Sequence, residues 1–266
     1  MQMQNHKEEK RRVILVTGCS SGIGKDICKN MKMRGNIVVA TARKVESLKE
    51  LDADLKLELD VTKEESIQKV IDEIMKKYRS IDVLVNNAGY SVRGVIEEVS
   101  IDDAEKIFQV NVFGIMRMIQ AVAPIMRKNQ FGKIINIGSI SGRYTQAANG
   151  SYCAAKHAVE AISEAARLEL APYNVQVSVI EPGPMQTEFF NTLSKTSDYL
   201  MENINSPYHS LYEKDIKFRK SQKRMPSEIA AERICNIIMK NKIKARYIIA
   251  FPYIMRAGIK ILEIIK

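Results

Sequence analysis

Residues 13–24 read VILVTGCSSGIG, a short apolar run followed by a turn rich in glycine and serine. Val13–Val16 is a continuous apolar run, which is typical of a strand whose two faces are both covered. Gly18, Gly22 and Gly24 let the backbone turn tightly and approach another group closely. A helical pattern follows at once, and a helix N-terminus offers free N–H groups to a phosphate. The stretch therefore predicts a strand–turn–helix unit that binds a pyrophosphate.

Further apolar runs rich in β-branched residues predict six more strands along the chain: Ile37–Ala40, Leu55–Leu59, Ile81–Val85, Lys133–Ile137, Val175–Ile180 and Arg246–Phe251. Helical patterns lie between most of them. Alternation of strands and helices predicts a doubly wound parallel α/β sheet with helices on both faces. We expect about seven strands in a single domain that spans residues 1–266.

Four helices are predicted: Gly22–Arg34, Lys63–Tyr78, Ile101–Lys128 and Ser151–Leu170. Gly35 provides a C-cap for the first helix. Thr62 and Glu65 have the spacing of a capping box at the start of the second helix. Pro124 either kinks the third helix or marks its last turn.

The C-terminal third has a different pattern. Residues 187–225 are polar and show no clear periodicity, so we interpret 184–225 as a substrate-binding lid, with a merely variable loop as the alternative. Residues 252–266 have the pattern of a helix with one polar stripe. We expect this helix to pack on its own domain or at a subunit contact, and a membrane-surface helix is the alternative.

Composition limits the classes of function. The net charge is +10, which suits an electropositive cleft for a polyphosphate cofactor or a basic solvated surface. Aromatic residues make up only 6% and tryptophan is absent, which argues against a nucleic-acid-binding surface. The charged N-terminal stretch 1–12 does not have the pattern of a signal peptide, and without a run of ~18 apolar residues we do not expect a membrane-spanning helix. Four cysteines without metal-ligand spacing predict reduced thiols in a cytoplasmic protein and no metal: Cys19, Cys28, Cys153 and Cys235.

Several motifs together resemble the short-chain dehydrogenase/reductase family. The turn has the spacing T-G-x-x-x-G-x-G, and Asn86-Asn-Ala-Gly89 follows the fourth predicted strand. Ser139 and a Tyr152-x-x-x-Lys156 pair follow, and a P-G…T segment closes the series at residues 182–187. The resemblance covers residues 11–190. It implies a Rossmann fold and an oxidoreductase that moves hydride between a nicotinamide cofactor and an alcohol or ketone.

The choice between the two nicotinamide cofactors rests on the end of the second strand. An NAD site commonly has an acidic residue there, which binds the ribose hydroxyls. Ala40-Thr-Ala-Arg43-Lys44 contains no acid, and the Arg43 guanidinium suits a forked contact with a 2′-phosphate. Ser20 can add a hydrogen bond. We therefore predict NADP(H), with a surface arginine just past a strand end as the alternative reading of Arg43.

The resemblance also implies a set of cofactor contacts. Asp60 takes the place where the family has an acid near the adenine ring. The full set that we predict is Gly18, Ser20, Ser21, Gly22, Ile23, Gly24, Arg43, Asp60, Val61, Asn87, Ala88, Gly89, Tyr152, Lys156, Pro182, Gly183 and Thr187.

Four residues form the predicted catalytic set. Tyr152 and Lys156 are one helical turn apart, so both side chains lie on one face, and a nearby ammonium lowers the pKa of a phenol. Ser139 ends a strand at the edge where ligands bind, and its hydroxyl can bind the substrate oxygen. By resemblance, Asn111 holds a water that relays protons to Lys156. His157 faces elsewhere and is interpreted as structural.

The substrate is less well determined. Residues 41–44 and 181–187 and the glycine turn resemble the subgroup of 17β-hydroxysteroid dehydrogenase type 1, retinol dehydrogenases and bacterial reductases, which implies a bulky apolar alcohol or ketone. Candidate pocket residues are Tyr144, Met185, Phe189 and Phe190, for which core or lid packing is the alternative. A catalytically weak NADP-binding regulator is the alternative function. The two long helices 101–128 and 151–170 resemble the pair through which relatives form homodimers and homotetramers.

Overall fold

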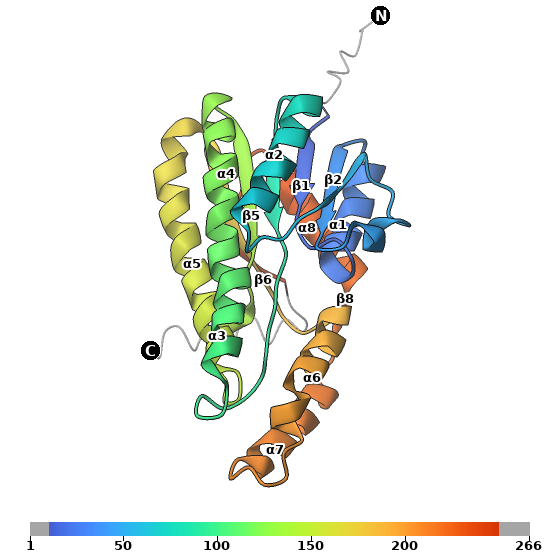
Figure 1. The fold of residues 1–266 in the computed structure, drawn as a ribbon. Coiled ribbons are helices and arrows are strands. Elements are labelled where there is room, and N and C mark those ends of the chain that lie inside the picture. Colours follow the sequence, from blue (N-terminus) through green and yellow to red (C-terminus); the bar gives the residue numbers. More distant parts are fainter. Residues whose placement is uncertain (1–10, 250–266) are drawn as a thin grey trace, which may run out of the picture.

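The computed structural model describes residues 11–249 and has a parallel sheet of seven strands (Figure 1). The strand order is β3-β2-β1-β4-β5-β6-β9, which confirms the predicted doubly wound topology. The strands are β1 Val13–Val16, β2 Ile37–Ala42, β3 Leu55–Glu58, β4 Val83–Asn86, β5 Gly132–Ile137, β6 Val175–Pro182 and β9 Arg246–Ile249. The last two residues of the predicted strand 246–251 lie outside the described residues, as does the predicted helix 252–266.

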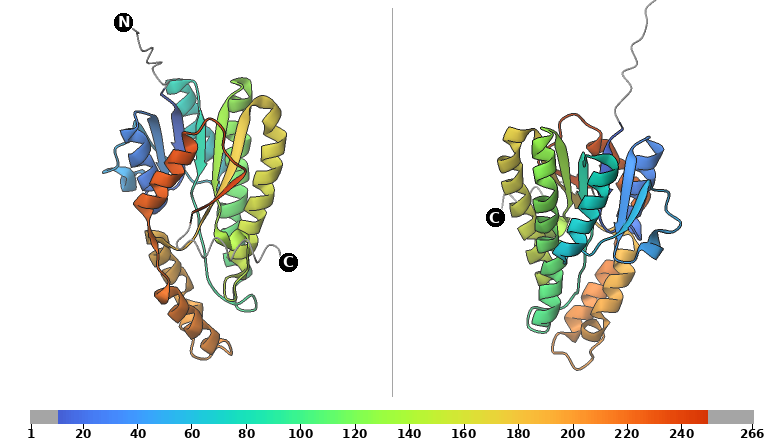
Figure 2. Two further views of the ribbon diagram at one scale, coloured as in Figure 1. Left: turned by 180° about the vertical axis from the view of Figure 1, so that it is seen from behind. Right: turned by 45° about the horizontal axis from the view of Figure 1, so that its top comes forward.

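Helices cover both faces of the sheet (Figures 1 and 2). One face carries α1 (Gly22–Met33) and α8 (Ser227–Ile238), which pack against each other. The other face carries α2 (Glu64–Tyr78), α4 (Gly114–Lys128) and α5 (Gly150–Leu170). The central strands β1, β4 and β5 are thus buried on both sides, as their continuous apolar runs predict, whereas the edge strands β3 and β9 are mostly half-buried.

The first strand shows how sequence alternation distributes the core. Successive side chains of a strand point to opposite faces. Ile14 and Val16 accordingly join the hydrophobic cluster under α1 and α8, and Val13 and Leu15 join the cluster under α2 and α4. All four side chains are buried. A run without polar residues is therefore the pattern that this sandwiched position requires.

The helix predicted at 101–128 is continuous but changes its winding. The segment α3 (Ile101–Phe108) leads through a π-helical turn, Gln109–Phe113, into α4. The wider turn changes the hydrogen-bond pattern of the backbone, and the Asn111 side chain donates to the Ile107 carbonyl at 2.8 Å. The helix Ile101–Lys128 is long and apolar enough to cross a membrane, at a mean hydropathy of 1.2, but its buried residues contribute to the core beside the sheet.

The predicted capping box at Thr62 is wrong. The helix α2 begins at Glu64 after Lys63, and no side chain caps its first N–H groups. Thr62 instead donates its hydroxyl to the Asp60 carboxylate at 2.7 Å, and its backbone N–H donates to the same oxygen at 3.0 Å. The acidic side chain two residues earlier therefore outcompetes the helix end for the threonine.

The region 187–225 is helical, and the prediction of an irregular segment is wrong. The helices α6 (Glu188–Met201) and α7 (His209–Ser221) project from the carboxyl end of the sheet (Figures 1 and 2). Two short strands join their bases, β7 (Met185–Gln186) and β8 (Met225–Pro226). Tyr212 is the buried residue of α7, so that helix shows little apolar periodicity in the sequence.

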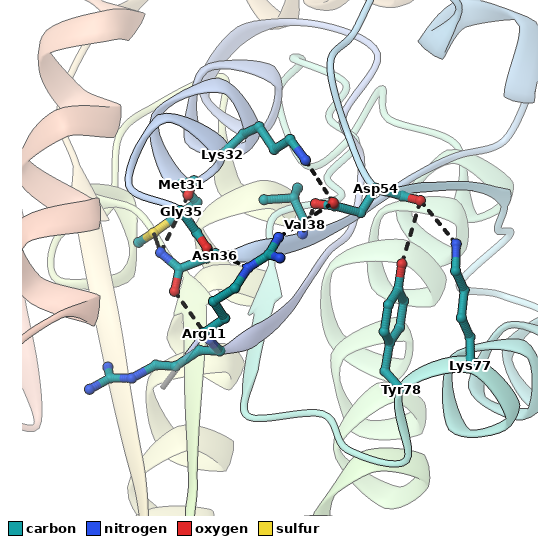
Figure 3. A network of polar contacts seen from close by, with 10 residues as sticks. Arg11, Met31, Lys32, Gly35, Asn36, Val38, Asp54, Lys77 and Tyr78 are labelled. Carbon is teal, nitrogen blue, oxygen red and sulfur yellow. Dashed lines mark hydrogen bonds and ion pairs between the residues drawn. The ribbon is translucent and has the colours of Figure 1, made fainter. Parts of the chain in front are cut away.

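A polar network braces the sheet edge beside β3 (Figure 3). The Asp54 carboxylate accepts hydrogen bonds from Lys32 Nζ at 2.6 Å and from the Val38 N–H at 2.9 Å. Its backbone carbonyl accepts from Lys77 and Tyr78 of α2. Burial alone would raise the pKa of Asp54, but the bonds from Lys32 and Val38 outweigh it and lower the pKa. One aspartate thus ties α1, β2 and α2 together.

Candidate active site

A cavity of about 950 Å³ opens at the carboxyl ends of the strands. It extends past the junction of β1 and β4, where the strand order reverses direction, which is the place where doubly wound sheets bind ligands. All four residues of the predicted catalytic set line it. So does every predicted cofactor contact except Gly24. The cavity therefore unites residues that the sequence separates by more than a hundred positions.

Glycine is required at the turn after β1 for two different reasons. Gly18 and Gly22 adopt φ angles of +70° and +56°, which other residues rarely tolerate. Gly24 is buried behind the turn, where an added Cβ would lie 2.4 Å from Asn87 Nδ2 and 2.5 Å from the Gly18 carbonyl oxygen. The prediction that Gly24 contacts the cofactor is thus not supported, because the residue permits close packing instead of facing the cavity.

The segment after β4 holds that turn in place. Asn87 donates from Nδ2 to the carbonyl oxygens of Thr17 and Gly18 at 3.0 and 2.9 Å. The Thr17 hydroxyl accepts from the backbone N–H groups of Asn87 and Ala88, each at 3.0 Å. These four bonds lock the two loops into one cradle that is shaped for a dinucleotide. Thr17 is a supporting residue that the sequence motif contains without revealing its role.

Arg43 and Asp60 line the same cavity beyond the ends of β2 and β3. Burial opposes ionisation of Asp60, but hydrogen bonds from Thr62 and the charges of Lys63 and Arg43 lower its pKa. Arg43 itself is exposed. A guanidinium at this position is accessible to a phosphate group, whereas Asp60 is an ionised hydrogen-bond acceptor.

The catalytic side chains come together from two elements. Tyr152 and Lys156 lie on the first turns of α5, and Ser139 follows β5 at the start of the 3₁₀ turn Ile140–Gly142. Ser139 lies close enough to Tyr152 for its hydroxyl to interact with the phenol and to lower the pKa of Tyr152 against the effect of burial. Lys156 Nζ lies 5.6 Å from the centre of the Tyr152 ring and donates to the Ile137 carbonyl at 2.8 Å. Two hydroxyl groups thus meet at one point in the cavity.

The prediction that the pKa of Tyr152 lies below its ordinary value is wrong for this structure. Burial raises the pKa of Tyr152 to about 12, and the interaction with Ser139 opposes this only in part. Burial also lowers the pKa of Lys156 to about 8, against the opposing charge of Glu160. The lysine ammonium is held by the Ile137 carbonyl and not by the phenol oxygen. Tyr152 is consequently protonated at neutral pH, as a proton donor must be.

Asn111 is fully buried within the π-helical turn. Its side-chain nitrogen donates to the Tyr90 carbonyl at 2.6 Å and to the Ile107 carbonyl at 2.8 Å. The residue therefore ties the loop after β4 to the helix below the cavity. The proton relay that the family resemblance implies for Asn111 remains a prediction.

Aromatic and apolar side chains line the cavity near Tyr152. Phe189 lies with its ring centre 6.2 Å from that of Tyr152, and Tyr144 and Met185 line the same space. The side chain of Phe190 lies outside what the structure describes. His157, which we interpret as structural, has its Nδ1 at 2.8 Å from the Cys153 carbonyl on its own helix.

Among the lining residues that the sequence does not single out are three arginines: Arg93, Arg219 and Arg224. They belong to no motif, and they come from a loop and from the α7 region. Only the tertiary fold brings them to one wall of the cavity. A count of basic residues is the sole sequence signal, and it does not locate them.

Comparison with known proteins agrees with this site. The family model described as short chain dehydrogenase matches residues 12–198. The chain is 33% identical over 232 residues to the 3-ketodihydrosphingosine reductase of Bacteroides thetaiotaomicron, covering 86% of this chain and 84% of that protein. It is 32% identical over 250 residues to the NADPH-dependent 3-dehydrocapnine reductase of Ornithobacterium rhinotracheale, covering 90% and 88%.

Among solved structures, the closed form of a serine dehydrogenase in complex with NADP⁺ superposes with a TM-score of 0.78 at 29% identity. The match covers 89% of this chain and 94% of that one. Sequence match and fold thus agree, and the chain belongs to the short-chain dehydrogenase family of nicotinamide-dependent oxidoreductases.

Proposed function

We propose that the protein is an NADPH-dependent reductase that converts a bulky, largely apolar ketone into a secondary alcohol. The observation that carries the proposal is the meeting of Ser139 and Tyr152 in the cavity that the glycine turn also lines. A hydroxyl pair beside a dinucleotide cradle suits reduction of a carbonyl, because both hydroxyls can hydrogen-bond its oxygen.

The chemistry follows from the protonation states. NADPH, when bound, supplies the hydride that the carbonyl carbon receives. Tyr152 donates its phenolic proton to the carbonyl oxygen, and Ser139 stabilises the negative charge that develops there. Below about pH 8 Lys156 is an ammonium 5.6 Å from the centre of the Tyr152 ring, and its charge offsets that of the phenolate until a solvent proton restores the phenol. The raised pKa of Tyr152 keeps the proton on the phenol before the reaction, as reduction requires.

Support for NADP(H) comes from Arg43, which stands where an acid would select NAD. One relative is named as NADPH-dependent and one solved neighbour holds NADP⁺. The glycine turn supports a dinucleotide, because Gly18 and Gly22 line the cavity with positive φ angles that other residues rarely adopt. Gly18, Gly22 and Arg43 would therefore hold the pyrophosphate and the 2′-phosphate.

Support for a ketone substrate comes from the lining of the cavity and from the relatives. Tyr144, Met185, Phe189 and Leu193 offer apolar surface beside Tyr152. Two relatives carry the names of reductases, and one name specifies a keto compound. A steroid-like or retinoid-like substrate remains part of the proposal. We also propose that α6 and α7 form a lid over the substrate and that the enzyme is cytoplasmic.

The test is oxidation of NADPH or NADH by the purified full chain, followed at the nicotinamide absorbance band, with a panel of ketones. The panel includes steroid ketones, retinal, long-chain methyl ketones and small quinones. We expect turnover with NADPH and one group of apolar carbonyl compounds. Tight NADPH binding without turnover of any carbonyl compound would favour the alternative, a regulator that binds NADP and has little activity.

A further inference from the structure

Three arginines line one wall of the cavity: Arg93 from the loop after β4, Arg219 from α7, and Arg224 just beyond α7. Arg93 Nη2 donates to Asp215 Oδ1 at 2.7 Å, and Arg219 Nε donates to Asp215 Oδ2 at 2.8 Å. Arg224 donates to the Arg219 backbone carbonyl at 3.0 Å. One carboxylate thus bridges two guanidinium groups, and a third lies within hydrogen-bonding distance of the same helix.

The cluster is crowded with positive charge. Burial lowers the pKa of Arg93, and the charge of Arg219 lowers it further against the attraction of Asp215. Burial and the same Arg219 charge also lower the pKa of Arg224. Like charges in a partly desolvated wall raise the energy of the site unless an anion offsets them. Asp215 supplies one negative charge to the pair of arginines that it bridges.

Arg93 retains an unused donor. Its side chain is only 7% exposed, and its buried Nε–H has no hydrogen-bond partner among the described residues. A guanidinium has five N–H donors, and a buried donor left without an acceptor is costly. Because Arg93 lines the cavity, a ligand that enters can supply the missing acceptor.

The cluster lies near the reacting group. The backbone of Gly94 pairs with Asn149, the residue that precedes α5, and its N–H donates to Ala148 at 3.1 Å. Arg93 is therefore fixed beside the start of the helix that carries Tyr152. Its charge opposes the rise that burial causes in the pKa of Tyr152. Phe189, Leu193 and Phe218 line the same cavity with apolar surface.

We infer that the substrate is an amphipathic anion whose oxyanion group, a carboxylate, sulfonate or phosphate, binds to Arg93 and Arg219 beside Asp215, while its apolar part lies against Phe189, Leu193 and Phe218. This inference rests on the proposed reductase function, because it names the class of ketone that the same cavity accepts. It is separate from the cofactor phosphates, which we assign to the glycine turn and Arg43.

A purely structural role for the same residues makes a different prediction. If the Asp215 ion pairs serve only to latch α7 against the body of the protein, Asp215→Asn weakens the binding of charged and neutral ligands alike. If the arginines bind an anion, Asp215→Asn adds net positive charge while its amide oxygen still accepts from Arg93. The affinity for an anion is then retained or increased.

Binding of decanoate and of 1-decanol to the NADP⁺-saturated full chain, measured by titration calorimetry, tests the inference without requiring turnover. We expect decanoate to bind at least about tenfold more tightly than 1-decanol, as one charge-assisted contact allows. Arg219→Gln should abolish this preference, whereas Arg219→Lys should retain most of it. Lys217→Gln, at an exposed position of the same helix, is the matched control and should leave the preference unchanged.

Equal affinity for the two ligands in the wild-type protein overturns the inference, as does a preference that persists in Arg219→Gln. If Asp215→Asn binds neither decanoate nor 1-decanol, the ion pairs serve to hold α7 against the body of the protein, and the inference of an anion site is also overturned. Turnover of neutral ketones with no decanoate preference defeats this inference and leaves the reductase intact. A decanoate preference without turnover of any ketone, charged or neutral, defeats the reductase and leaves an anion site.

Discussion

At the scale of single residues, we propose that Arg43 selects NADP(H) over NAD(H). It is exposed at the cavity, and no acid stands with it at the end of β2. We predict that Arg43→Ala raises the KM for NADPH about 10- to 100-fold, as loss of a charge-assisted hydrogen bond implies. The KM for NADH should hardly change. Lys44→Ala, the neighbouring exposed position, is the control, and steady-state kinetics with both cofactors provide the measurement.

An equal rise in the KM for NADPH and for NADH in Arg43→Ala would show that the arginine does not bind the 2′-phosphate. If Lys44→Ala raised the KM for NADPH as much as Arg43→Ala does, the phosphate contact would extend one residue further along the chain.

The protonation states of Tyr152 and Lys156 predict the pH dependence of reduction. Tyr152, with a pKa raised to about 12, stays protonated through neutral pH and does not limit the rate there. Lys156, with a pKa lowered to about 8, loses its charge above that pH. Because the ammonium stabilises the phenolate that proton donation leaves, kcat for ketone reduction should be constant below about pH 8 and fall above it.

Steady-state kcat measured with saturating NADPH across that range checks this prediction. A kcat that rises with pH through the region near 8 would contradict the assigned roles. The sequence shows that Tyr152 and Lys156 share a helix face but cannot show how deeply each is buried. The predicted direction of the Tyr152 pKa shift is wrong for that reason, since desolvation exceeds the opposing effects of Ser139 and Arg93.

At the scale of elements, Asp54 is the residue for which we predict the largest effect on the stability of the fold. Because hydrogen bonds lower its folded-state pKa, it stabilises the fold above its unfolded pKa of about 4, and this contribution is lost as pH falls through the folded value. Asp54→Asn should therefore reduce the free energy of unfolding at neutral pH by about 1–2 kcal/mol. The difference in the free energy of unfolding between Asp54→Asn and the wild type should disappear in acid. Asp52→Asn, an exposed neighbour, is the control and should have little effect.

Urea unfolding at several pH values measures both variants. If the difference in the free energy of unfolding between Asp54→Asn and the wild type persisted unchanged below about pH 3, the stabilisation by Asp54 would not depend on its charge.

Elements with a full apolar pattern are predictable from this sequence, and elements that depend on tertiary context are not. The strand Val13–Val16 is predicted to the residue, because both faces of β1 are buried and every position must be apolar. Helix α7 is missed because Tyr212 is its buried residue and most of its surface is polar. The start of α2 is misplaced because Asp60 takes the Thr62 hydroxyl, a competition that spacing alone does not reveal.

The same distinction holds for the site. Ser139, Tyr152 and Lys156 belong to spaced motifs, and the structure brings them to one cavity. Arg93 and Arg219 are more than a hundred residues apart and meet through Asp215 only after α7 has folded over the cavity. Motif spacing therefore predicts the shared chemistry of the family, whereas the groups that select a substrate emerge from the fold.

At the scale of the whole molecule, the net charge of +10 is partly explained by the cavity, where basic lining residues outnumber acidic ones among those described. The negative charges of a nicotinamide cofactor with three phosphate groups and of an anionic substrate would complement this excess of basic residues. No nucleic-acid partner is needed to account for it.

The homo-oligomer remains a prediction for the whole molecule. Helices α4 and α5 lie side by side (Figures 1 and 2), and Phe113, Met116 and Leu168 in this region are 42%, 36% and 60% exposed. We expect sedimentation velocity to give at least twice the chain mass of 30.1 kDa, and Leu168→Glu to shift the protein towards monomer. A wild-type protein that sediments as a single chain at micromolar concentration would contradict this.

The most direct test of the central claim is NADPH oxidation by the wild-type protein and Tyr152→Phe with a ketone that the wild type reduces. Phenylalanine keeps the ring that packs near Phe189 and removes only the proton that Tyr152 donates. The account predicts a loss in kcat of at least about 100-fold, the scale of general acid catalysis, with NADPH affinity unchanged. Full turnover by Tyr152→Phe would contradict the assigned mechanism.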